Sequence, residues 1–377
     1  MRGSIRTDGG RFFIIGLGSM VLLLLPVVGA AQKIKMENGI PVVYNPKKPV
    51  KKAGLPSQLF LRRDLLIGEA AGDENYVFSE LGSVQADNEG NIYALDSKEV
   101  KLRVFDQTGK FLRSFLRKGQ GPKEVQLPAR MIMTPAERLC IYDLANRRLA
   151  FYSKAGECLK EINAAKWSFI RMRHDSRGTI YADSLVMDIK SLVLKLMKFD
   201  PELNLISTIS EFARERRPGK VDVMPDRFVF EVAKGDRFLW GITSKYEIHV
   251  LDPGGKLVRK IVKDFDPVKV TDKDKQERLK DRPSVPITVE YIFPEHFAPI
   301  YATIIDNRGW LYVRTNERDE KGNCVYDIFD EDGILFSRFA HPESEILFQI
   351  RKNKMYFMIS ENEEGIPQIK RYAAEWK

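Results

Sequence analysis

Histidine and carboxylate side chains are the groups of this 377-residue chain that could perform acid–base or metal chemistry, and their spacing matches no common catalytic motif. The sequence contains no His-Glu-x-x-His pair for zinc, no Gly-x-Ser-x-Gly turn for a nucleophilic serine and no Gly-x-x-x-x-Gly-Lys-Ser/Thr loop for phosphate. The histidines are His174, His249, His296 and His341. His296 stands out because Glu295 adjoins it in a stretch that we expect to be exposed. The pair could bind a ligand or act in catalysis; the alternative is that His296 only fixes its loop.

A second group of polar residues follows strand-like stretches at equivalent places in three repeated units. These residues are Asp96, Asp143, Asn146 and Asp183. Their positions would allow them to face a shared central channel. Aspartates at such places also cap turns by accepting hydrogen bonds from backbone N–H groups, so both interpretations stay open.

Two arginines follow Asn146 directly. Arg147 and Arg148 could present hydrogen-bond donors to an anionic ligand at the rim of the fold. The alternative is that both side chains are simply solvated. We keep Arg147 as a candidate binding residue.

The elements that must position these residues are short strands that come in fours. The stretch 83–115 contains four of them, with turns at 87–90 and 106–109 that use Asp, Asn and Gly. These residues suit tight turns because they hydrogen-bond their own backbone or accept positive φ. The strands are rich in Val, Ile, Tyr, Leu and Phe, as a half-buried pleated surface requires. Such a unit cannot bury both faces alone, so it must recur.

The unit does recur along the chain. Its first turn and second strand return at 87–93, 136–142, 175–181, 234–240, 306–312 and 352–357. Its second turn returns at 104–109, 151–156, 198–204, 250–255 and 328–333. The last unit therefore lacks one strand, and an isolated strand at Phe60–Ile67 can supply it. Since a ring of sheets must close to leave no open edge, we predict an all-β fold, a six-bladed β-propeller closed by its N-terminal strand.

One unit is longer than the others because of an insertion at Lys263–Pro299, between the fourth and fifth blades. Within it, Thr271 is a good N-cap for a helix whose first turn holds acidic residues and which ends before Pro283. The helix is almost wholly polar, so we expect it on the surface. Insertions in repeat proteins commonly gather on one face, often the binding face.

The N-terminal part of the chain divides into two segments. Residues 1–31 are typical of a signal peptide, with three arginines, an apolar core at 12–28 and small residues at 29–31; an uncleaved membrane anchor is the alternative. Residues 32–57 predict an irregular strap in which only Ile40–Tyr44 resembles a strand, and 58–377 forms the propeller. We therefore expect a periplasmic or secreted protein with no stable membrane span after signal cleavage.

Charge and cysteine content exclude some classes of function. The net charge is +9, but no basic run with interleaved aromatic residues is present, so we expect no nucleic-acid partner. Cys140, Cys158 and Cys324 are an odd number, and the first two would lie two strands apart, too far for a bridge. We expect free thiols.

The Asp-x-x-Gly-x-Ile-Tyr hairpins and Phe-Asp-x-x-Gly turns resemble those of NHL-like six-bladed propellers exported by bacteria. The loop at Lys118–Glu124 is similar to a Gly-x-Gly-Pro-Gly-Glu-Phe loop of such proteins, but Lys123 and Val125 depart from that pattern. The resemblance covers roughly residues 40–377 and implies the fold. Most of these families have no assigned activity.

Two functions remain as expectations. The first is an exported, non-catalytic propeller without a cofactor that binds an envelope or extracellular protein, peptide or glycan through loops at one mouth of the ring, including 263–299. The alternative is a metal-assisted hydrolase or lyase similar to gluconolactonase, in which Asp96, Asp143, Asn146 and Asp183 would hold Ca²⁺ or another divalent cation in the channel. A structural subunit of an envelope assembly is a third option. We favour binding over catalysis.

Overall fold

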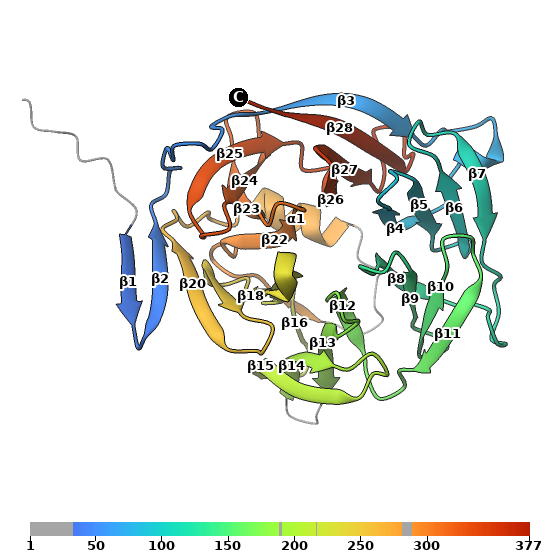
Figure 1. Ribbon diagram of the computed structural model, residues 1–377, viewed down its shortest axis with the longest axis horizontal. Helices are drawn as coiled ribbons and strands as arrows, with labels where there is room; N and C mark the ends of the chain where they lie inside the picture. Colours follow the sequence, from blue (N-terminus) through green and yellow to red (C-terminus); the bar gives the residue numbers. More distant parts are fainter. Residues whose placement is uncertain (1–32, 188–190, 216, 281–288) are drawn as a thin grey trace, which may run out of the picture. The chain divides into compact units, whose positions relative to one another are not determined.

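The computed structural model describes residues 33–187, 191–215, 217–280 and 289–377. The predicted signal segment, 1–31, lies outside them. In the described part, six antiparallel sheets are arranged around a ring (Figure 1). Blades 1 to 3 consist of β4 (Leu81–Ala86), β5 (Ile92–Asp96), β6 (Lys101–Phe105) and β7 (Phe111–Phe115); β8 (Pro128–Met133), β9 (Leu139–Asp143), β10 (Arg148–Tyr152) and β11 (Cys158–Asn163); and β12 (Phe169–His174), β13 (Ile180–Met187), β14 (Ser191–Phe199) and β15 (Leu205–Glu215).

Blades 4 to 6 complete the ring. They consist of β17 (Phe228–Val232), β18 (Phe238–Ile242), β19 (Glu247–Leu251) and β20 (Leu257–Lys263); β22 (Ile300–Ile305), β23 (Leu311–Arg318), β24 (Cys324–Phe329) and β25 (Leu335–His341); and β26 (Ile346–Arg351), β27 (Lys354–Ile359), β28 (Gln368–Trp376) and β3 (Leu59–Ile67). The predicted six-bladed β-propeller is confirmed.

Aspartate-led turns explain why the chain reverses where it does. In the first blade, Oδ1 of Asp87 accepts hydrogen bonds from the N–H groups of Glu89 and Asn91, both at 2.9 Å. Gly90 completes the turn with φ of 91°, a conformation that glycine adopts without steric cost. Aspartates at equivalent turns bond their backbone in the same way: Asp106, Asp175, Asp200, Asp306 and Asp330.

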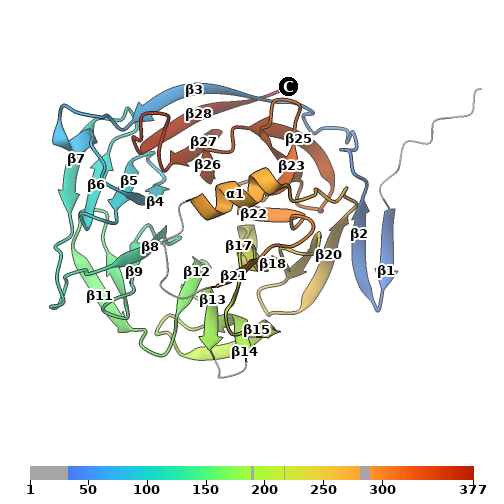
Figure 2. The ribbon, with the colours of Figure 1, turned by 180° about the vertical axis from the view of Figure 1, so that it is seen from behind.

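The ring closes through its N-terminal strand, as predicted. β3 pairs antiparallel with β28, with Ile67 opposite Ile369 and Leu59 opposite Trp376. The two strands lie side by side in both ribbon views (Figures 1 and 2). The last blade thereby gains its fourth strand from the start of the propeller domain.

The hydrophobic core lies between the blades. Six clusters of buried apolar residues each join two neighbouring blades, the last one joining blade 6 to blade 1 through Ile67, Ile369 and Phe105. Each blade packs one face against the blade before it and the other face against the blade after it. The interfaces together therefore form one continuous core around the ring.

The segment expected to be an irregular strap, 32–57, is regular in its first half, where the predicted strand at Ile40–Tyr44 is present. β1 (Lys33–Glu37) and β2 (Ile40–Asn45) form a hairpin, and β2 pairs parallel with β20, so that blade 4 becomes a six-stranded sheet. The hairpin forms because Asn38 and Gly39 both take positive φ, the geometry that matches strand twist in a two-residue turn. That turn signal was overlooked in the sequence. Residues 46–58 contain no strand.

The predicted helix is present as α1 (Asp272–Lys280). Thr271 caps it: the hydroxyl of Thr271 accepts from the Asp274 N–H at 3.2 Å, and the Asp274 carboxylate accepts from the Thr271 N–H at 2.8 Å. None of its residues is buried. Figure 2 shows α1 in front of the blades, on the face of the ring that is turned away from the viewer in Figure 1.

Two other expectations have structural outcomes. Cys140, Cys158 and Cys324 are free thiols, as predicted, and β10 separates the first two. Within the described ranges, no helix combines the length and apolar character that crossing a membrane requires.

Candidate functional site

Asp96 is buried at the end of β5, where its carboxylate fixes the segment that leads into the first blade. Its carboxylate accepts from the backbone N–H groups of Ser79 at 2.7 Å and Glu99 at 3.0 Å. Its Oδ2 also lies 3.4 Å from Nη1 of Arg103, a buried side chain. These contacts satisfy the carboxylate within its own blade.

Asp143 likewise fixes the segment that leads into the second blade. It accepts from the backbone N–H groups of Gln126 and Leu127 at 2.9 and 3.0 Å, just before β8 begins. Asn146 donates to it at 2.6 Å and to the Gly119 carbonyl at 3.0 Å. Asp143 and Asn146 are thus brought together, but to fix the loop between blades 1 and 2.

Arg147 and Arg148 also bind backbone rather than presenting free donors. Arg147 is exposed, and its Nη2 donates to the Ala165 carbonyl at 2.5 Å. Arg148 donates to the carbonyls of Gly121 and Glu124 at 2.8 and 2.6 Å. The glycine-rich loop at 118–124 is therefore an inter-blade turn held by side chains.

Asp183 differs from the other two aspartates. Its Oδ1 accepts from the Arg171 N–H at 2.7 Å, but its Oδ2 is buried without a hydrogen bond, 4.0 Å from the equally unbonded Nη2 of Arg171. Burial raises the pKa of Asp183, against the opposing charge of Arg171. Burial likewise lowers the pKa of Arg171 to about 10. This pair is close but incompletely satisfied.

Polar side chains on the first strands mainly join neighbouring blades. Arg173 and Glu231 form a bidentate ion pair between blades 3 and 4 at 2.8 and 2.9 Å. The other interstrand contacts are Gln349 with Ala86, Gln85 with Met133, Ser83 with Met131, Arg130 with Ile170 and Thr303 with Glu231. These contacts join the first strands of neighbouring blades around the ring.

Divalent-cation binding finds no support in this geometry. The carboxylates of Asp96, Asp143 and Asp183 each accept hydrogen bonds from backbone N–H groups near the start of their own blade. Among the residues that the structure describes, no group of three or more His, Cys, Asp or Glu side chains is placed to hold a metal ion. The candidate residues for the metal-dependent alternative therefore do not form one site.

The remaining histidines have local partners or bury their rings. His249 bonds Glu247 at 2.6 Å and His341 bonds Glu345 at 2.7 Å. His174 is buried, which lowers its pKa to about 4. Glu295 and His296 are exposed on the insertion, where their backbone pairs with residues 269 and 270.

A large hollow lies beside this insertion. It is a cavity of about 620 Å³ whose wall includes His296. Most of its lining is apolar: Phe212, Met224, Pro225, Phe265, Pro267, Ile292, Phe293, Pro294, Phe297 and Pro299. Glu295 does not line it. The structure thus separates the two members of the predicted pair.

A second insertion, which sequence reasoning missed, completes this cavity. Residues 217–227 connect blades 3 and 4, and within them β16 (Lys220–Asp222) pairs parallel with β21 (Glu290–Ile292) of the first insertion. The pairing ties the two connections into one surface at the mouth of the ring. Pro218 and Pro225, which bracket a connection too long for a hairpin turn, were the available signal in the sequence.

A smaller hollow of about 200 Å³ adjoins the cavity. The two share Met224, Pro225, Phe297 and Ala298. The smaller one adds polar groups, chiefly Arg227, Arg278 of α1 and Tyr301 of β22. An apolar cavity and a polar pocket are therefore continuous.

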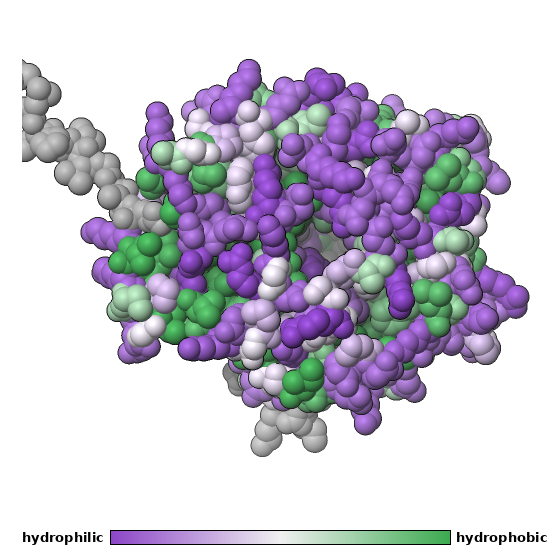
Figure 3. All heavy atoms as spheres, in the orientation of Figure 1, coloured by the Kyte–Doolittle hydropathy of each residue, from purple (hydrophilic) through white to green (hydrophobic). Residues whose placement is uncertain are grey.

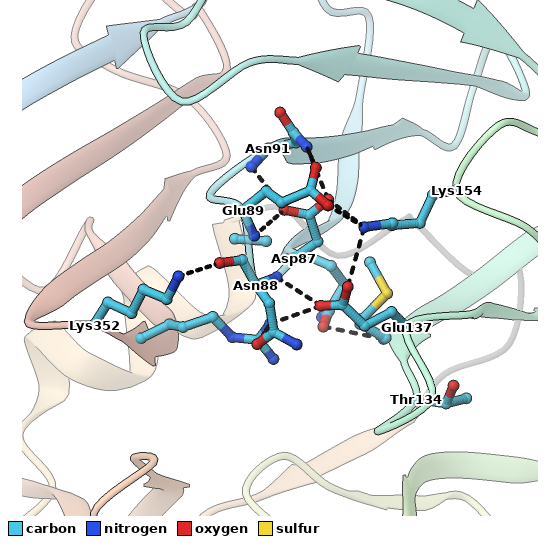
Figure 4. A network of polar contacts seen from close by, with 12 residues as sticks. Asp87, Asn88, Glu89, Asn91, Thr134, Glu137, Lys154 and Lys352 are labelled. Atoms are coloured by element: carbon cyan, nitrogen blue, oxygen red, sulfur yellow. Dashed lines mark hydrogen bonds and ion pairs between the residues drawn. The ribbon is translucent and has the colours of Figure 1, made fainter.

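The opposite face of the ring carries a network of charges instead. Lys154 contacts Glu89 at 2.9 Å and Glu137 at 3.0 Å, and these carboxylates raise the pKa of Lys154 (Figure 4). Glu137 in turn accepts from the Asn88 N–H at 2.6 Å. These bonds link the first turns of blades 1 and 2. Figure 3 shows this face, where hydrophilic side chains surround a central hollow.

Comparison with known proteins agrees with this architecture. Residues 72–234 match the model of the DUF5128 family, described as a 6-bladed beta-propeller. The match covers less than half of the chain, and the fold that the family description names is the one that the structure shows. This confirms the resemblance expected from the repeated hairpins. No curated protein matches the propeller.

Solved structures with low sequence identity share the fold. A Bacteroides fragilis protein provisionally described as exported is 12% identical, with a TM-score of 0.51 over 89% of this chain and 99% of that chain. A DUF4221 family member from Bacteroides vulgatus is 10% identical, with a TM-score of 0.52 over 85% and 100%. Virginiamycin B lyase from Staphylococcus aureus is 10% identical over 84% and 99%, but its TM-score of 0.44 carries no argument about activity.

Proposed function

We propose that this propeller is an exported, non-catalytic binding protein that captures a peptide segment of an envelope or extracellular protein at the mouth formed by 217–227, 264–280 and 289–299. The observation that carries the proposal is the apolar cavity between the two insertions. Its volume, about 620 Å³, falls within the range of ligand sites. The adjoining blades anchor the ends of both insertions, which limits the ordering needed on binding.

The chemistry of the lining favours a peptide over a glycan. Phenylalanine and proline dominate the wall, and these side chains accept apolar peptide side chains better than hydroxyl-rich sugars. The short parallel pair β16–β21 adds a sheet edge beside the cavity, a place where an extended peptide can pair its backbone.

Binding of displayed peptides tests the proposal. Peptides selected from a random display library on the full propeller are synthesised, and their dissociation constants are measured by fluorescence anisotropy. Phe293→Ala removes an aromatic ring from the cavity wall and should weaken binding by about tenfold or more, as expected for loss of an aromatic anchor.

Phe60→Ala is the matched control, because Phe60 is 46% exposed on β3 and does not line the cavity. If the selected peptides bind equally well to both variants, they bind outside the apolar cavity. Failure of any peptide to bind the propeller would count against the proposed function as a whole.

A further inference from the structure

The small pocket beside the apolar cavity has an unusual charge balance. Among the described residues that line it are two arginines, Arg227 and Arg278, and no carboxylate. Elsewhere in the described chain, arginines commonly face Asp or Glu, as Arg173 faces Glu231. The described part of the pocket wall therefore carries positive charge, which attracts an anion.

Arg227 is fixed in place without being neutralised. Its Nη2 donates to the Tyr301 carbonyl at 3.3 Å, and its guanidinium lies 5.5 Å from the centre of the Tyr301 ring. No ion pair involves Arg227 among the described residues. The neighbouring Asp226 accepts from the Thr243 hydroxyl at 3.2 Å.

Arg278 reaches the same pocket from the helix. It is exposed on α1 and forms no hydrogen bond or ion pair with another described residue. Asp274, one turn earlier on α1, is bonded to Thr271 at the start of the helix. The helix therefore carries a guanidinium to the pocket, while Asp274 caps the helix and the adjacent Glu277 lies 3.8 Å from Lys273.

Two other polar side chains that line the pocket already have hydrogen-bond partners. Asn316 donates to the Ala298 carbonyl at 2.7 Å, and the Thr243 hydroxyl accepts from the Arg227 N–H at 3.0 Å. Arg314 stands behind Tyr301, with its guanidinium 4.3 Å from the ring centre. These contacts leave the guanidinium groups as the principal donors that a ligand can reach.

We infer that the mouth takes a peptide that places a carboxylate against Arg227 and Arg278 and a neighbouring bulky apolar side chain in the adjoining cavity. This inference rests on the proposed function and names the chemistry of its ligand. Arginine binds carboxylates through paired, charge-assisted hydrogen bonds. The pocket and the cavity together would therefore recognise an acidic group next to an apolar side chain.

Fluorescein-labelled hexapeptide pools test the inference. In each pool one position is fixed as Glu or Gln, the adjacent position is Phe or Leu, and the carboxy terminus is either free or amidated. We expect a pool with a carboxylate to bind the propeller about tenfold more tightly than its neutral counterpart, with the advantage falling as salt rises. The Glu arm and the free-terminus arm show which carboxylate the pocket takes.

Arg227→Met and Arg278→Met should each reduce the preference for acidic over neutral pools severalfold. Arg63→Met is the control, since Arg63 is exposed on β3 and the change removes the same charge. Thermal unfolding of each variant checks that the propeller remains folded.

Different results would contradict the carboxylate assignment and the proposed peptide site. If neutral and acidic pools bind equally well, and Phe293→Ala still weakens both, the carboxylate assignment is overturned and the proposed peptide site stands. If Arg63→Met lowers the preference as much as the pocket variants do, the pocket is not the source of the preference. If no pool binds, both proposals are wrong.

Discussion

Ile67 lies directly opposite Ile369 in the sheet ladder of the last blade, although about 300 residues of chain separate them. Both side chains belong to the cluster that joins blade 6 to blade 1. Their contact is therefore where the start and the end of the propeller seal the ring.

Ile67→Ala should lower the stability of the whole propeller. Ile67 is 1% exposed, and truncation of a buried isoleucine to alanine typically costs ~2–5 kcal/mol through lost contacts and a residual cavity. The midpoint of urea unfolding measures the effect. Leu66→Ala, at a 45% exposed neighbour on the same strand, should change it little. Equal midpoints for both variants would show that this strand does not close the core.

Asn45→Ala should weaken the contact between the hairpin added to blade 4 and the neighbouring blade 5. The buried Asn45 side chain donates to the Gly333 carbonyl at 2.9 Å and accepts from the Leu335 N–H at 2.8 Å. Its removal leaves two backbone groups without partners, at a cost of about 1–3 kcal/mol each if they stay buried. Thermal unfolding measures the loss, with exposed Lys33→Ala in the same hairpin as control. A variant as stable as the control would contradict this role.

Gly156 and Gly255 separate two costs of replacing a turn glycine. Both have φ near 90°, but a Cβ on Gly156 would lie 2.6 Å from the Phe115 ring of the preceding blade, whereas Gly255 has open space. Gly255→Ala should cost about 1 kcal/mol from backbone strain alone. Gly156→Ala should cost ~1–3 kcal/mol more from overpacking. Denaturant midpoints compare the two variants, and an equal loss would mean that the Phe115 contact is readily relieved.

Glu345 should make stability depend on acidic pH. Burial alone would raise its pKa, but hydrogen bonds from His341, Lys370 and Tyr372 outweigh burial and lower it from 4.5 to about 2. Since the folded-state pKa lies below the unfolded one, the stabilisation is complete above about pH 4.5 and is lost as the pH falls toward 2.

The matched variants are Glu345→Gln and Glu364→Gln, the latter at an exposed carboxylate. At neutral pH, Glu345→Gln should cost on the order of 2–3 kcal/mol, and the difference from the native propeller should shrink between pH 4.5 and 3. Urea midpoints measured across this range provide the check. A difference that stays constant with pH would contradict the assigned pKa.

Local chemistry made the ring predictable from the sequence. Each aspartate-led turn bonds its own backbone within four residues, as Asp87 does, so strand boundaries follow from short stretches of sequence. Counting the turns exposed a missing strand, and Phe60–Ile67 was the stretch that could supply it. The helix after Thr271 was predictable for the same reason, since its cap is formed by residues three positions apart.

Long-range contacts decided what the sequence left open. Asp96 and Asp143 could have faced the channel, and only their bonds to N–H groups about 16 residues earlier show that they hold strand entries. Likewise, no local signal reveals that β2 pairs with β20 or that 217–227 pairs with the later insertion, because those partners lie far along the chain. Turn chemistry is local and therefore visible in sequence, whereas a cavity is made by side chains that meet only after the ring has closed.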